Sequence, residues 1–225
     1  RALAAYQKWK AAEAKNAKTN TRLMFLDEDL GWVTTDRLVG WIRKFIARIL
    51  GPLEYPHVLT HAYHSTGAST RVRRSPLAAL DKVSGECHIT EDAIKHYLAA
   101  WSGTMLSKEL KIVGGNIAFT VPKKTEIDRA AAKEPEGNLI LQRSVGIHIR
   151  DRLRLFGINL RDQGQNQRLA QEALARKLAT VDLSSASDSI TTQLVTMLLP
   201  FEWWSLLDDL RSRFTYIEGS WHENE

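Results

Sequence analysis

The sequence has a single cysteine, Cys87, among its 225 residues. One thiol excludes a framework of internal disulfides and is typical of proteins from a reducing compartment. No apolar run approaches the roughly 18 residues of a membrane helix, and the first residues lack the apolar stretch of a signal peptide. These absences exclude a disulfide-stapled secreted domain and a membrane-spanning protein, so we expect a protein of the cytosol.

Internal repeats are also missing, as are low-complexity segments beyond an Ala- and Lys-rich start. The chain is 44% hydrophobic, which is enough for a core of ordinary size. Its 31 basic and 26 acidic residues give a net charge of +5. This mixed but basic surface favours a polyanion such as nucleic acid as a partner.

Apolar spacing predicts an α+β fold in which helices dominate. We expect helices over residues 1–15, 35–50, 90–101, 138–156 and 166–179, the second capped by Thr35 and stopped at Gly51. In residues 117–121, apolar side chains alternate with others, as in a half-buried strand. We expect Pro122 to terminate this strand. The last residues, "IEGSWHENE", are polar and turn-like with no evident closing element, so we expect a fragment.

The stretch "ATVDLSSASDSI", residues 179–190, places two acids around a run of small hydroxyl residues. We interpret it as a strand, a tight turn and a helix that Pro200 ends. Asp182 closes the apolar strand, where a carboxylate is costly to bury unless it is paired or binds a cation. Mg²⁺ binds through one or two carboxylates plus substrate phosphates, so Asp182 is a candidate ligand. A strand-end aspartate solvated by its loop is the simpler alternative.

Asp188 has two explanations. Ser185-Ala-Ser-Asp188 matches a capping box, with a serine N-cap and an acid at the third helical position. A carboxylate at this place could instead accept a hydrogen bond from a sugar hydroxyl and so distinguish a ribonucleotide from a deoxyribonucleotide. The spacing alone does not choose between these uses.

Two stretches carry clustered cations. "TVPKKTEIDRAAAKEP" supplies lysine point charges and an arginine fork that suit a triphosphate, although a solvated basic loop balanced by acids is the simpler alternative. "STGASTRVRR" joins small hydroxyls and a glycine to three arginines, an arrangement suited to an RNA backbone but equally to a surface turn. The cations are Lys123, Lys124, Arg129 and Lys133 in the first stretch and Arg71, Arg73 and Arg74 in the second.

These motifs together resemble one known family. "TVDLSSASDSI", followed by "LLPFEWWSLLDDLRS", is similar to polymerase motif A of the RNA-bacteriophage (levivirus) replicases. "TVPKKTEIDRAAAKEP" resembles the basic motif of their fingers, and "GIHIRDRLRLFGINLRDQGQNQRLAQEALARKLA" resembles the segment between the two motifs. The resemblance is continuous over residues 119–213 and looser before them, where "HSTGASTR" resembles a glycine-containing fingers loop.

The resemblance implies an N-terminal fragment of the beta subunit of an RNA-directed RNA polymerase, a nucleotidyltransferase with a right-hand fold. Residues 1–110 would form an N-terminal helical region and the start of the fingers, and residues 111–177 the fingers with the basic motif. Residues 178–225 would form the first strand and helix of the palm.

By the same resemblance, Asp182 would be a catalytic ligand of two Mg²⁺ ions and Asp188 would lie near the ribose of the incoming nucleotide. Lys123, Lys124 and Arg129 would contact nucleotide phosphates. The implied partners are RNA template and product, nucleoside triphosphates, host elongation factors Tu and Ts and ribosomal protein S1, in the cytoplasm of a bacterial host.

The sequence departs from the family pattern in one respect. The family's palm continues into Met-Gly-Asn-Gly and Gly-Asp-Asp segments, and neither occurs here. The Asp208-Asp209 pair follows Leu207 inside a helix-like stretch. We therefore expect that these residues alone do not polymerise RNA. The alternative function is a non-catalytic nucleic-acid-binding module in which both acids are structural.

Overall fold

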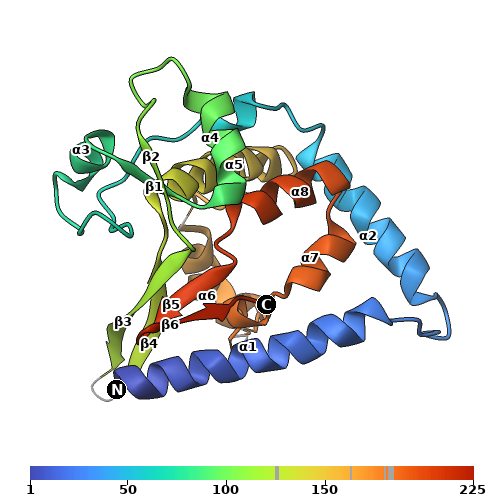
Figure 1. Cartoon of the computed structure of the whole chain (residues 1–225). Coiled ribbons are helices and arrows are strands. Elements are labelled where there is room, and N and C mark those ends of the chain that lie inside the picture. Colours follow the sequence, from blue (N-terminus) through green and yellow to red (C-terminus); the bar gives the residue numbers. More distant parts are fainter. Residues whose placement is uncertain (125–126, 163, 180, 182–184) are drawn as a thin grey trace.

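The computed structural model describes residues 1–124, 127–162, 164–179, 181 and 185–225, without the side chains of Lys124 and Ile127 (Figure 1). The fold is α+β, as predicted. The helices are α1 (Ala2–Met24), α2 (Thr35–Leu50), α3 (Ala78–Val83), α4 (Ile94–Trp101), α5 (Glu136–Leu155), α6 (Gly164–Arg176), α7 (Thr192–Leu198) and α8 (Phe201–Leu210). Short 3-10 helices are η1 (His57–Leu59), η2 (Glu91–Ala93) and η3 (Ser187–Ser189). Within the described ranges, no helix is long and apolar enough to cross a membrane.

The core is built around α5, which packs against α4, α8 and η1 (Figure 1). Ile140 and Leu141 of α5 are at most 1% exposed and share one apolar cluster with Tyr97 of α4 and Trp203 of α8. Full burial of such side chains contributes roughly 1.5–3 kcal/mol each. The helices expected over residues 90–101 and 138–156 are confirmed, the first of them as η2 followed by α4.

The first turn of α5 is held by polar groups inside this core. Asn138 is fully buried. Its Nδ2 donates to Thr90 Oγ1 at 2.6 Å and to the Leu210 carbonyl at 3.1 Å, while its Oδ1 accepts from the Thr90 amide at 2.9 Å. One amide side chain therefore fixes the segment before α4 and the end of α8 against α5.

The larger sheet has the strand order β4-β3-β5-β6, and a separate parallel pair joins β1 to β2. The strands are β1 (Cys87–Ile89), β2 (Leu110–Ile112), β3 (Asn116–Lys124), β4 (Ile127–Lys133), β5 (Phe214–Ile217) and β6 (Ser220–Glu223). β3 and β4 form an antiparallel hairpin, and β5 runs parallel to β3. The sheet therefore joins segments that lie about eighty residues apart in the chain.

The prediction that Pro122 terminates its strand was wrong. β3 continues through Pro122, which pairs with Asp128 of β4 just before an irregularity in the register. β5 reaches only Asn116 and Ile117, so among the described strands none lies on the other side of β3 at the proline. A proline, which lacks an N–H, is tolerated at such an unpaired edge or bulge.

The polar end of the chain was also misjudged, because it forms the β5–β6 hairpin. Ile217 faces Ser220 in the register, leaving a two-residue turn. Glu218 and Gly219 both have positive φ, at 48° and 95°. Turns of this kind fit the twist of a hairpin, but they favour Gly, Asn or Asp at both positions, so glutamate concealed the signal.

α2 has the predicted length and stops at Gly51, whose φ is 71°. Its N-cap is Thr34, one residue earlier than expected, because Thr35 Oγ1 instead accepts from the Glu28 amide at 3.1 Å. Only the end of its apolar face is buried. Trp41 and Phe45 remain 49% and 59% exposed, while Leu50 belongs to the core and Ile46 packs against it.

We expect Asn138→Ala to lower the free energy of unfolding by about 1–3 kcal/mol, because the buried Thr90 amide loses its partner. The Leu210 carbonyl keeps its hydrogen bond from Gln142 Nε2 at 2.8 Å. The exposed Asn166 on α6 provides the matched control, Asn166→Ala. Urea unfolding followed by circular dichroism measures both. Equal unfolding midpoints for the two variants would contradict the role given to Asn138.

Candidate nucleotide and RNA interface

The basic motif forms the β3–β4 hairpin and not a loop, which corrects the expectation for Arg129 and Lys133. Arg129 pairs with Val121 across the hairpin, and both Arg129 and Lys123 are exposed. Neither cation makes a hydrogen bond or ion pair with another described residue, so both are available to an anion. Lys133 instead lies over the Phe119 ring at 5.3 Å. Lys124 ends β3, and its side chain lies outside the described part.

Asp182 lies outside the described residues. The described residues of the apolar run before it, Leu178, Ala179 and Val181, belong to no strand. Val181 is 79% exposed. The rest of the expected strand lies, with Asp182, outside the described residues.

Asp188 lies in η3, and the capping box predicted around it does not form. Ser185 has a φ of 53° and bonds the Asp188 amide through its carbonyl at 3.0 Å, while the Asp188 carboxylate accepts from Ser187 Oγ at 3.1 Å. The helix starts later, at Thr192, with Thr191 Oγ1 accepting from the Leu194 amide. Because Thr191 caps the helix, the exposed Asp188 carboxylate is not needed for that purpose.

Two buried asparagines of α1 hold this turn, and sequence reasoning missed them. Asn16 Nδ2 donates to the Asp188 carbonyl at 2.9 Å. Asn20 Nδ2 donates to Thr192 Oγ1 at 3.0 Å, and its Oδ1 accepts from the Gln193 amide at 2.9 Å. The available signal was two asparagines four residues apart, since asparagine is a poor helix former and its repetition on one helix face needs a reason.

α1 connects the two candidate elements. Figure 1 shows it running from the β3–β4 hairpin past the C-terminus to α7, and it packs against β4, η3 and α7. Lys123, Arg129 and Asp188 share no hydrogen bond or ion pair within the described ranges. The cations and the carboxylate therefore do not contact each other, but the elements that carry them pack against the same helix, α1.

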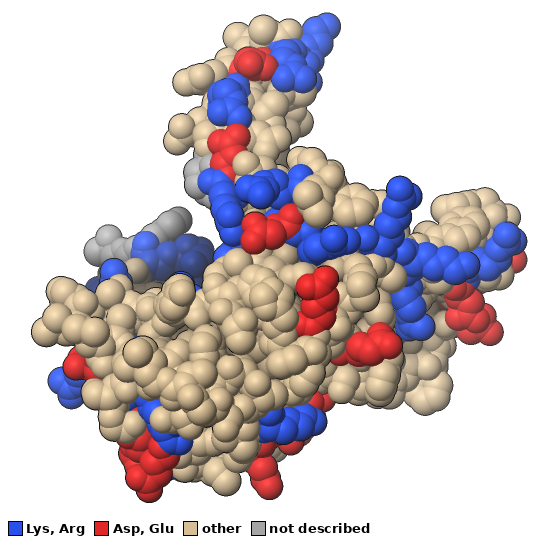
Figure 2. Space-filling view, turned by 90° about the horizontal axis from the view of Figure 1, so that it is seen from above, with Lys and Arg blue, Asp and Glu red and all other residues tan. Residues whose placement is uncertain are grey.

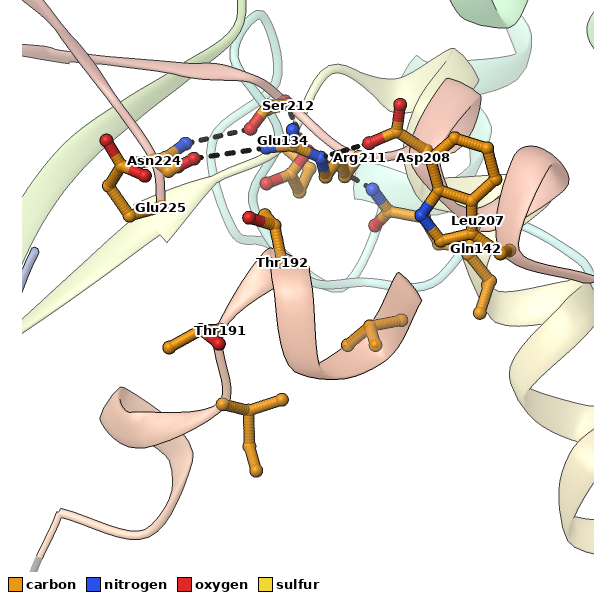
Figure 3. A pocket seen from close by; sticks show the side chains of 13 residues that line it. Glu134, Gln142, Thr191, Thr192, Leu207, Asp208, Arg211, Ser212, Asn224 and Glu225 are labelled. Carbon is orange, nitrogen blue, oxygen red and sulfur yellow. Dashed lines mark hydrogen bonds and ion pairs between the residues drawn. The ribbon is translucent and has the colours of Figure 1, made fainter. Parts of the chain in front are cut away.

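A pocket of about 390 Å³ opens beside the Asp188 turn. Its lining residues are Glu134, Gln142, Ile190, Thr191, Thr192, Val195, Trp204, Leu207, Asp208, Arg211, Ser212, Asn224 and Glu225. Figure 3 shows Glu134, Arg211, Ser212 and Asn224 gathered on one side of it. Glu134 accepts from Ser212 Oγ at 2.6 Å and from Asn116 Nδ2 at 2.7 Å. These polar groups satisfy one another and so join the sheet to the end of α8.

The Asp208-Asp209 pair is used by the fold. Asp208 forms ion pairs with Arg211 and Arg213, each at 2.7 Å. Asp209 contacts Lys95 Nζ at 2.8 Å and His96 Nε2 at 2.9 Å. Burial alone would raise the pKa of Asp209, but hydrogen bonds from Lys95 and His96 lower it overall. Both carboxylates therefore anchor α8, consistent with their helical position.

The arginines of the second basic stretch divide into two groups. Arg71 Nε donates to Oε1 of the buried Glu136 at 2.7 Å, and its Nη2 donates to the carbonyls of Asp81 and Ser84. Arg73 and Arg74 are exposed and make no hydrogen bond or ion pair within the described ranges. The RNA-binding role expected of all three therefore suits Arg73 and Arg74, while Arg71 holds the loop in place.

Basic side chains also gather across one face of the molecule. Figure 2 shows a band of Lys and Arg across the middle of one face and along a projecting arm, where acidic side chains alternate with them. Much of the surface below the band is uncharged in this view. A basic band of this kind attracts the phosphates of a nucleic acid without reading its sequence.

Comparison with known proteins identifies relatives along the whole chain. A family model described as "RNA replicase, beta-chain" matches residues 1–225. The RNA-directed RNA polymerase beta chain of Escherichia phage MS2 is 37% identical over 226 residues, covering 96% of this chain and 41% of the phage protein. The RNA-directed RNA polymerase subunit beta of Escherichia virus Qbeta is 39% identical over 213 residues, which cover 92% of this chain and 36% of the Qbeta protein. The chain thus spans about two-fifths of the length of these relatives.

We expect Arg71→Met to destabilise the fold by about 3–5 kcal/mol, because it leaves the buried Glu136 carboxylate without its cation. The control, Arg73→Met, removes an exposed guanidinium of the same loop and should shift stability by less than about 0.5 kcal/mol. Chemical unfolding compares the two variants. If both lose the same stability, the Arg71–Glu136 pair is not the anchor of this loop.

A pH effect follows from His64, whose two ring nitrogens have no partner within the described ranges. Burial, together with the charges of Lys108 and Lys82, lowers the pKa of His64 from 6.5 to about 4. The unfolded chain then binds the extra proton first, so stability contributed by neutral His64 is lost as pH falls from 6.5 toward about 4.

We expect His64→Gln to flatten the dependence of unfolding free energy on pH across this window, because glutamine does not titrate. The exposed His57 serves as the control, His57→Gln. Urea titrations at several pH values between 4 and 6.5 check this. Parallel profiles for His64→Gln and the unmodified chain would exclude a buried neutral His64.

Proposed function

The chain belongs to the family of RNA replicase beta-chains, and from this we propose that it forms part of an RNA-directed RNA polymerase that replicates the genome of an RNA bacteriophage. The observation that carries the proposal is the match along all of residues 1–225, together with relatives that are named RNA-directed RNA polymerases. The reaction is nucleotidyl transfer, in which a 3′ hydroxyl attacks the α-phosphate of a nucleoside triphosphate and pyrophosphate leaves.

In this proposal the β3–β4 hairpin binds the triphosphate. Lys123 and Arg129 are exposed and unpaired within the described ranges, and Lys124 is their neighbour at the end of β3. Lysine supplies a point charge and arginine a planar fork, so together they neutralise the phosphates and orient them for in-line attack. An antiparallel hairpin, paired along both strands, fixes the backbone that carries these charges.

Asp188 is proposed to recognise the ribose. Its carboxylate is exposed, while its amide and carbonyl are both hydrogen bonded, so the side chain projects from a fixed backbone. A carboxylate so placed accepts a hydrogen bond from a ribose hydroxyl, and the 2′ hydroxyl is the group that distinguishes RNA precursors from DNA precursors. The Ser187 hydroxyl, which donates to the same carboxylate, leaves further acceptor capacity for the sugar.

A divalent metal ion is expected of a polymerase of this family. Among the residues that the structure describes, no group of three or more His, Cys, Asp or Glu side chains could hold one. The described residues thus do not complete a metal site by themselves. We propose Asp182, outside the described residues, as a Mg²⁺ ligand that acts with the carboxylates of the family's Gly-Asp-Asp turn. When bound, the metal would supply Lewis-acid stabilisation of the phosphates.

The architecture proposed for the whole protein is a right hand. Residues 1–110 would contribute the N-terminal region and the start of the fingers, residues 111–177 the fingers, and residues 178–225 the start of the palm. RNA template and product would lie on basic surface that includes Arg73 and Arg74. Host elongation factors Tu and Ts and ribosomal protein S1 are proposed partners in the bacterial cytoplasm, on the family resemblance alone.

We expect Asp182→Asn, in the complete polymerase chain that carries these residues, to reduce RNA synthesis by about a hundredfold or more while leaving RNA binding unchanged. The matched control is Asp27→Asn, which changes an exposed aspartate before α2. Primer extension measures synthesis and filter binding measures affinity for RNA. Normal synthesis by Asp182→Asn would instead favour the alternative, a non-catalytic nucleic-acid-binding module.

A further inference from the structure

We infer that Asn16 and Asn20 of α1 are positioning residues that set the ribose selectivity of Asp188 from the opposite end of the chain. The inference rests on the proposed role of Asp188, and it adds to that role the groups that place the carboxylate. Asn16 lies 172 residues before Asp188 in the sequence.

The hydrogen bonds hold Asp188 itself and the start of the helix that follows it. Asn16 holds the carbonyl of Asp188 itself at 2.9 Å. Asn20 holds the start of α7 through the Gln193 amide and Thr192 Oγ1, at 2.9 and 3.0 Å. The segment between them is short, so fixing Asp188 and Thr192 to one rigid helix fixes the turn that carries the carboxylate.

The position of the two asparagines argues for a built interface. Asn16 is 5% and Asn20 is 6% exposed, on a helix that is otherwise mostly exposed. They continue a face that also contains Trp9, whose ring meets His222 edge-on at 6.3 Å, and Glu13, which accepts from the Glu225 amide at 2.7 Å. This contact face, residues 9, 13, 16 and 20, has the four-three-four spacing of one side of a helix.

The chemistry explains why asparagine is used. An asparagine amide donates and accepts at once, and Asn20 uses both groups, toward Thr192 and Gln193. Burying these amides without partners would be costly, so the helix is stable in this place only when the turn occupies its bonding position. The same bonds therefore order the helix and the turn together, and they leave the Asp188 side chain free for a ligand.

A hydrogen bond between a carboxylate and a single hydroxyl depends steeply on distance and angle. A turn released from α1 would still carry Asp188, but it would hold the carboxylate in several positions. Recognition of the 2′ hydroxyl would weaken, while binding of the triphosphate by the β3–β4 hairpin would be retained. Selectivity for ribonucleotides should therefore fall before polymerisation itself is lost.

The test is made in the complete polymerase chain with Asn16→Ala, Asn20→Ala and the reference variant Asp188→Ala. The control is Thr21→Ala, since Thr21 is exposed on α1 and, among the residues described, its hydroxyl bonds only to the Ala17 carbonyl of the same helix. The measured quantity is the ratio of kcat/KM for a nucleoside triphosphate to that for its 2′-deoxy analogue. We expect each asparagine variant to lower this ratio by about two- to tenfold, and the control to leave it unchanged.

The outcomes separate the inference from the proposed function. If Asp188→Ala does not lower the ratio, the proposed ribose role of Asp188 is wrong. If Asp188→Ala lowers it but both asparagine variants behave like Thr21→Ala, the positioning inference is overturned. Should Asn16→Ala fail to fold, Asn16→Asp replaces it, because aspartate keeps the size of the side chain and sets a charged acceptor, in place of the donor, against the Asp188 carbonyl. An unchanged ratio for a folded Asn16→Asp would likewise overturn the inference.

Discussion

The polar side chains buried in the first turns of α5 are the constraint on which the body of the structure depends. Burying a charge or an amide inside an apolar core is costly unless the group has a hydrogen-bond or ion-pair partner. Glu136 therefore binds Arg71, Asn138 binds Thr90 and the end of α8, and Ser144 accepts the Ala62 amide at 3.0 Å. Each of these contacts brings a different chain segment to α5. Directional hydrogen bonds, as well as the burial of apolar area, therefore determine which segments pack against this helix.

This arrangement separates structural charges from available ones. Arg71 and the Asp208-Asp209 pair are consumed by ion pairs in or near the core. Arg129, Lys123 and the arginines at 73 and 74 lie on surface elements that the core only supports. A sequence cannot make this distinction, because a cation that anchors a loop and a cation that binds phosphate are the same residue type in the same stretch.

α1 has a different relation to the rest of the fold. It contributes little to the apolar core, it packs against the β3–β4 hairpin, and it holds the turn of Asp188 through hydrogen bonds. Helices held mainly by their neighbours have low stability alone. The position of the Asp188 turn therefore depends on a helix whose own order depends on that turn, and this coupling spans nearly the whole chain.

The sequence by itself determined the features that short-range physics controls. The spacing of apolar residues predicted α2, α4, α5 and α6, because it follows the period of a helix, and Gly51 and Pro200 marked two ends through their backbone preferences. The motifs around Asp182 and Lys123 identified the family, which the match over residues 1–225 confirmed.

Tertiary structure alone decided which distant residues make contact and which local hydrogen bonds form. It made the basic loop a hairpin, gave the helix cap to Thr191, and placed Asn16 on the Asp188 carbonyl. Such contacts join groups more than a hundred positions apart, or select one of several equivalent local bonds, and local preference cannot encode either choice.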